Sequence, residues 1–227
     1  MKVISTVIAI LYFSSAFCQQ DLALFRNDAY GRPLYLLPNF KSEGSPNYSD
    51  DYHIAAVTLE NGKVYNNLSI KLNLVTHTVQ YLEDGKEMVT TAPVKKIMFI
   101  NLPDEDGFRR NVQLETFTSA LNAPDAAVFE VLDTGKIKLV KKITITYRDD
   151  RKYNEAATTR IFERKEIYYS VDESAQPKRI EKGKSALLTI FPDNRDKVAS
   201  FIDQQKLSCR TEADFKRIFS FYNSLTL

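Results

Sequence analysis

Apolar and polar residues alternate through the middle of the chain, from about residue 52 to residue 182. Runs such as 54–59, 70–74 and 128–132 place apolar side chains at alternate positions, which puts them on one face of a β-strand. Polar turns separate these runs about every eight to twelve residues, a spacing typical of an antiparallel meander. The pattern predicts a β-rich region over residues 52–182.

Two turns in this region have a clear signature. Asn61-Gly62 joins an apolar run to the next one, and Asp84-Gly85 occupies a similar place further on. Asn-Gly is typical of a two-residue hairpin turn in which both residues adopt positive φ. We therefore expect a hairpin at Asn61-Gly62 with both residues in that conformation.

A long strand is predicted over residues 137–147, where apolar residues share one parity and lysines occupy much of the other. Lys141 falls on the apolar parity, so we expect a bulge or a break near Val140. A polar loop and a further strand over 159–171 follow. No strand or helix is assigned to residues 111–125, whose pattern is ambiguous.

Helical spacing replaces alternation from about residue 183 onward. Three short helices are predicted, and the last is the clearest, because Thr211 and Asp214 resemble a capping box. Its apolar stripe comprises Phe215, Ile218, Phe219, Tyr222 and Leu225. We expect this stripe to pack on the sheet, so that the chain forms one domain overall. The predicted fold class is α+β, mainly β, with a curved antiparallel sheet or roll followed by the helices.

Residues 1–18 have the layout of a secretory signal peptide. Lys2 precedes an apolar run of about eleven residues, whereas a bilayer-spanning helix needs about twenty. We expect export to the periplasm or cell surface and no transmembrane helix in the mature chain. Residues 19–51 read as an extended, proline-containing lead-in with one short strand at Leu34–Leu37.

Two processing routes fit the end of this segment. Ala16 and Cys18 suit cleavage between Cys18 and Gln19, which is the preferred interpretation. Cys18 could instead be lipidated and hold the chain on a membrane, but Phe17 occupies the place where a small residue is expected. After cleavage Cys209 is the remaining cysteine, so the domain depends on its apolar core and not on an internal disulfide.

The balance of charged side chains limits the kinds of ligand that the protein is expected to bind. Removing Lys2 with the signal leaves 30 basic and 29 acidic side chains. This balance gives no case for bulk electrostatic binding of nucleic acid. Lysine-rich strand faces, at 136–142 and 160–165, could bind an anionic polymer or lipid head groups, but such faces are more often the solvated side of a sheet.

Metal chemistry has one weak candidate, a calcium site at Asp104 and Asp106 beside Gly107. A complete EF-hand loop is missing, and the alternative is a solvated acidic turn. His53 and His77 lack the close spacing of zinc ligands and are expected in loops. Cys209 precedes the last helix and is interpreted as a small filler, with a reactive thiol as the alternative.

Catalytic motifs are not found: the chain has no Gly-x-Ser-x-Gly elbow, no His-Glu-x-x-His helix and no glycine-rich phosphate loop. The sequence therefore predicts no cofactor and no catalytic residues.

Several segments together resemble a family of uncharacterised exported proteins common in Bacteroidota. They are Gly44-Ser45-Pro46, the stretch 59–65, the stretch 81–86 and the tail Tyr222-Asn223-Ser224-Leu225. The resemblance covers about residues 44–225 and implies an envelope location, without an activity to carry over.

These observations favour a non-enzymatic binding or structural module of the cell envelope, with an unknown envelope protein or lipid as its partner. The alternative is a carrier of a lipid or small apolar ligand in the periplasm. An enzyme is a third hypothesis, which would need a polar cluster assembled from distant strands.

Overall fold

The computed structural model describes residues 25, 31–33, 40–104, 106–117, 127–151 and 158–225. These residues divide into two compact units. The first unit includes the described residues up to 117 together with 145–151 and 158–164, and the second includes 127–144 and 165–225. Strands β10 (Lys138–Asp150) and β11 (Thr158–Val171) contribute residues to both units.

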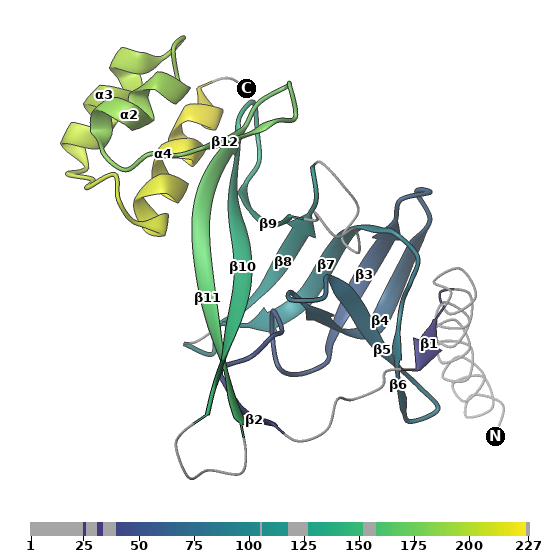
Figure 1. The fold of residues 1–227 in the computed structure, drawn as a ribbon. Coiled ribbons are helices and arrows are strands. Elements are labelled where there is room, and N and C mark those ends of the chain that lie inside the picture. The colour runs from purple at the N-terminus through teal and green to yellow at the C-terminus, as the bar shows by residue number, and fades with distance from the viewer. Residues whose placement is uncertain are drawn as a thin grey trace, which may run out of the picture. The chain divides into compact units, whose positions relative to one another are not determined.

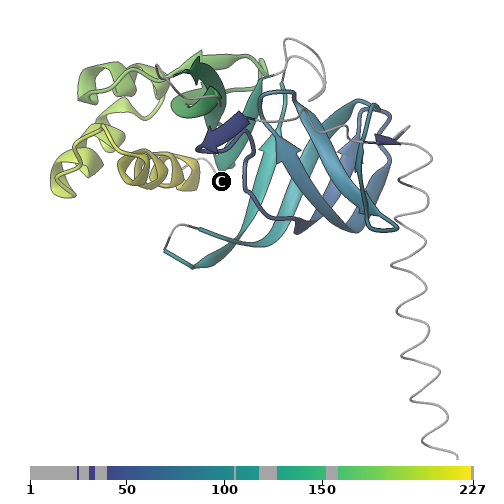
Figure 2. The ribbon, with the colours of Figure 1, turned by 60° about the horizontal axis from the view of Figure 1, so that its bottom comes forward.

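The protein is mainly β, with predominantly antiparallel strands and three short helices at the C-terminal end, as the sequence pattern predicts (Figure 1). The strands of the first unit form a curved sheet (Figure 2). Their order is β1 (Arg32–Pro33), β6 (Lys86–Val89), β5 (Thr78–Glu83), β4 (Val64–Asn73), β3 (His53–Leu59), β7 (Val94–Pro103) and β8 (Arg109–Glu115). One short strand, β2 (Phe40–Glu43), departs from the antiparallel pattern and pairs in parallel with β11.

The hairpin expected at Asn61-Gly62 is confirmed, because β3 and β4 pair antiparallel on either side of it. Its expected turn geometry is wrong: Gly62 has a φ of 85°, but Asn61 does not adopt positive φ. The Gly62 amide donates to the Leu59 carbonyl at 3.0 Å, so a turn is followed by one left-handed glycine. Asp84 and Gly85 instead both have positive φ, 48° and 74°, and form the two-residue turn between β5 and β6.

The stretch left unassigned in the sequence begins within strand β8, which extends to Glu115. This strand pairs with β7, where Ile97 lies opposite Leu114, and it buries Val112 and Leu114. Strand β7 supplies the other half of this buried face. Pairing with β7 therefore determines which residues of β8 are buried, more than the short sequence pattern of β8 does. Residues 118–126 lie outside the described part of the chain.

The second unit contains β9 (Val128–Asp133), β12 (Pro177–Arg179) and the adjoining parts of β10 and β11. The bulge predicted near Val140 is confirmed by a register shift between Leu139 and Val140. The helical elements are α2 (Lys184–Leu187), a 3₁₀ turn η1 (Leu188–Ile190), α3 (Arg195–Gln204) and α4 (Glu212–Ser224).

The predicted cap of α4 is confirmed. The Thr211 hydroxyl accepts a hydrogen bond from the Asp214 amide at 3.2 Å, which satisfies one of the helix's unpaired first-turn donors. Of the predicted stripe, Phe215, Ile218, Phe219 and Tyr222 are buried.

Predictions for the N-terminal region, including the signal peptide, the Cys18–Gln19 cleavage and the strand at 34–37, lie outside the described residues. None of the helices in the described part of the chain is long and apolar enough to span a membrane.

Candidate binding surface

The helices of the second unit rest on an aromatic core. The Phe191 ring lies 5.1 Å from the Phe219 ring and 4.6 Å from the Tyr222 ring, and Phe215 packs edge-on against Tyr168 of β11 at 5.2 Å. These side chains, with residues from β10 and α3, form one buried cluster. Aromatic edge contacts of this kind add to the stabilisation from burial, so α4 is held in a defined position.

Asn223 fixes α4 to the turn between β9 and β10. Its side-chain oxygen accepts from the Ile137 amide at 3.2 Å, and its side-chain nitrogen donates to the Ile137 carbonyl at 3.1 Å and to Asp133 at 2.9 Å. The turn passes so close that a Cβ on Gly135 would lie 2.3 Å from the Asn223 Cγ. Gly135 is thus required for space, because any larger side chain would collide with this amide.

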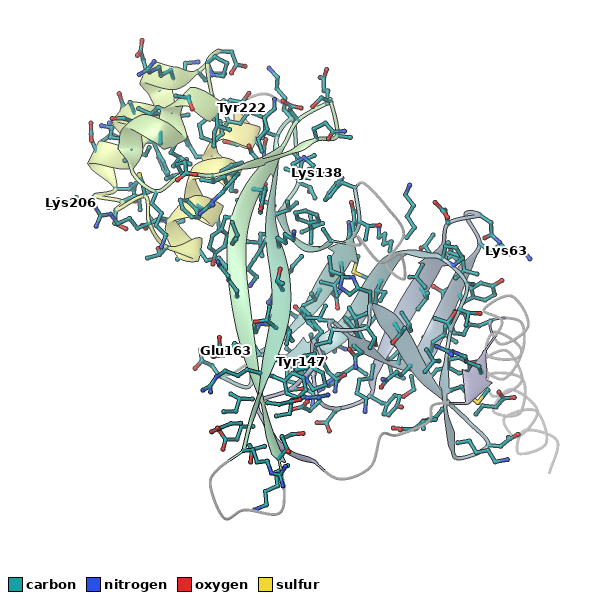
Figure 3. The ribbon with its side chains drawn as sticks, viewed as in Figure 1. Lys63, Lys138, Tyr147, Glu163, Lys206 and Tyr222 are labelled. Carbon is teal, nitrogen blue, oxygen red and sulfur yellow. The ribbon has the colours of Figure 1, made fainter. Side chains whose placement is uncertain are left out.

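Tyr222, which Figure 3 shows on α4, supports the same turn from the other side. Its hydroxyl donates to Asp193 at 3.0 Å, and the Lys136 ammonium donates to the same carboxylate at 2.7 Å. The lysine hydrogen bond holds the pKa of Asp193 below its usual value. The tail residues Tyr222 and Asn223, which carry part of the family resemblance, therefore have a structural role here.

A buried charge cluster ties α4 to the strands. The Lys141 ammonium lies 3.2 Å from Glu130 of β9, 3.5 Å from Glu166 of β11 and 3.0 Å from Glu212 of α4. The side chains of Lys141 and Glu130 are only 8% and 1% exposed. Burial alone would lower the pKa of Lys141, but attraction from Glu130 and Glu212 outweighs it and raises the pKa above its ordinary value.

Tyr168 completes this cluster through its hydroxyl, which donates to Glu212 at 3.2 Å. Burial, followed by repulsion from the Glu212 carboxylate, raises the pKa of Tyr168 to about 12. The phenol therefore stays protonated at neutral pH and remains a hydrogen-bond donor. The cluster is structural, since its groups are committed to each other.

A shallow groove lies beside α4 at the edge of this core, and Leu132 and Phe221, which line it, also pack against the core. We name it the α4 groove and define it by three adjoining hollows of about 600, 390 and 490 Å³. The first and second share Phe201 and Phe221, and the first and third share Leu132, Asp133, Ser220 and Ser224. Its walls come from α3, α4 and the β9–β10 turn, all within the second unit.

A pair of stacked phenylalanines is the main apolar feature of the α4 groove. The Phe201 and Phe221 rings are parallel within 4° with centroids 4.1 Å apart, and both side chains are half-buried. Leu132 adds a third apolar side chain, while Lys216 and Arg217 bring positive charge. This shallow surface combines an apolar centre with surrounding polar groups, as the contact surfaces of protein interfaces do.

The calcium candidates Asp104 and Asp106 lie exposed in the turn between β7 and β8. One Asp104 carboxylate oxygen accepts from the amides of Asp106 at 3.1 Å and Phe108 at 2.8 Å, so it stabilises the turn itself. No group of three or more potential metal-ligating side chains occurs among the described residues.

The two histidines lie in separate places. His77 is in the turn between β4 and β5, with a φ of 55°, as expected, whereas the expectation of a loop is wrong for His53, which is the first residue of strand β3. The His53 Nε2 lies 2.8 Å from the Ser49 hydroxyl, across the bend that precedes β3. A nucleophile and base pair also needs a group that orients the imidazole, and among the described residues no carboxylate hydrogen-bonds this ring.

Cys209 is fully buried, in agreement with its interpretation as a filler. Burial, followed by repulsion from Asp214, raises the pKa of its thiol, so the nearby helix start does not activate it.

Three cationic side chains within the lysine-rich segments 136–142 and 160–165 have carboxylate partners. Lys136 and Lys141 are committed as described above, and Arg160 donates to both oxygens of Asp149 at 2.7 and 2.8 Å. The Arg160 guanidinium also stacks on Tyr147, 4.2 Å from the ring centre. This arrangement fits the solvated sheet face better than a binding site for an anionic polymer.

The α4 groove was not found from the sequence. Phe221 lies outside the predicted apolar stripe of α4, and this large aromatic side chain off the stripe was the available signal, although the structure places it half-buried at the edge of the core. The contribution of the β9–β10 turn depends on tertiary folding and has no local signature.

Comparisons with known proteins found no match: no family model matches the chain, and no significant match occurs among the curated proteins or the solved structures.

Proposed function

We propose that this protein is an exported, non-enzymatic binding module of the cell envelope, with the α4 groove as its binding surface. The exported location rests on the signal-peptide pattern of residues 1–18. The binding role rests on the groove, whose half-buried stacked phenylalanines lie beside the buried aromatic cluster of the second unit. Such a preorganised aromatic surface loses little side-chain entropy when a partner binds.

The packing of aromatic side chains among the described residues favours a binding module over a carrier of lipid or small apolar ligands. In the first unit, Phe25, Tyr65 and Tyr81 meet edge to face at 5.3–5.4 Å, and all three are at most 5% exposed. Phe191, Phe215 and Phe219 fill the second unit in the same way. A carrier would need apolar interior space of the size of its ligand.

Affinity purification from the native envelope tests this proposal. The double variant Phe201→Ala/Phe221→Ala removes the aromatic surface, and we expect it to capture its partner at least tenfold less well than the unchanged chain. Phe108→Ala is the matched control, because Phe108 is 74% exposed on the β7–β8 turn and does not line the groove. Captured proteins, lipids and glycans would be quantified by mass spectrometry, and far-ultraviolet circular dichroism would verify folding.

Equal capture by the groove variant and the control would refute the α4 groove as the binding surface. Lipid that co-purifies with all three proteins would favour the carrier function instead.

A further inference from the structure

We draw no further inference here: the strongest candidate, the hollow of about 210 Å³ that the segment 44–50 forms with residues of β10 and β11 in the first unit, carries none, because the unpartnered side-chain oxygen of Asn47 beside it is sealed from solvent and nothing in the described part of the chain shows what occupies the hollow.

Discussion

Replacing Lys141 by alanine is expected to destabilise the second unit by about 3–5 kcal/mol. The change removes the ammonium that lies 3.2 Å from Glu130, and the charge of this carboxylate, whose side chain is 1% exposed, then lacks that compensation. Glu166 and Glu212 lose the same partner. Native-state hydrogen exchange of the α4 amides measures this loss of stability within the second unit. A local measurement is needed because two compact units need not unfold together.

Lys142→Ala is the matched control, since Lys142 is the neighbouring lysine but is not buried. We expect it to change stability by less than about 0.5 kcal/mol. A double variant, Lys141→Met/Glu130→Leu, should recover much of the loss, because apolar replacements leave no buried charge. Equal exchange protection in Lys141→Ala and Lys142→Ala would contradict the assigned role of the cluster.

The same cluster predicts a loss of stability in acid. Burial would raise the pKa of Glu212, but hydrogen bonds and attraction from Lys216 and Lys141 outweigh it and hold the pKa below its ordinary value. A carboxylate with a depressed folded-state pKa stabilises the protein above its unfolded pKa and loses this contribution as the pH falls through the folded value. Protection of α4 should therefore decline below about pH 4.5, and the Glu212→Gln variant should show a weaker decline.

Asn223→Ala is expected to destabilise the packing of α4 by about 2–4 kcal/mol. The change removes the partner of both the amide and the carbonyl of Ile137, which is 8% exposed, and leaves these backbone groups unsatisfied. Gly135→Ala should act in the same direction, because its new Cβ would push the Asn223 side chain away from these bonds. Hydrogen exchange at Ile137 and along α4 measures both effects.

Ser224→Ala is the control for this contact, because Ser224 is exposed and adjacent to Asn223. The Gly135→Ala and Asn223→Ala effects should be less than additive in the double variant, since both changes disrupt one set of hydrogen bonds. Strict additivity would show that the two positions act independently and would contradict the close approach.

The behaviour of Lys141 illustrates how far the sequence can predict this fold. Its place on an apolar parity correctly indicated a bulge near Val140, because strand periodicity is a local property. The three glutamates around it come from β9, β11 and α4, at sequence distances that no local pattern connects. The Thr211 cap and the α4 stripe were likewise predictable, since capping and helical periodicity are local.

Errors arose where tertiary pairing decided the structure. Strand β8 was left unassigned because its seven residues gain their burial from β7. Asn61 does not adopt the expected conformation, because the loop between β3 and β4 places a single left-handed residue, Gly62, after the turn. The α4 groove combines Leu132 of β9 with Phe201 of α3 and Phe221 of α4, a combination that only the folded chain produces.

Site-specific photo-crosslinking in the native envelope tests the central claim, that the α4 groove is the binding surface. A benzophenone amino acid at position 221 preserves an aromatic side chain in the groove, and the same probe at position 108 is the control on the exposed β7–β8 turn. We predict a specific adduct from position 221 that is absent or at least tenfold weaker from position 108. Adducts of equal yield from both positions, or an adduct from position 108 alone, would contradict the account.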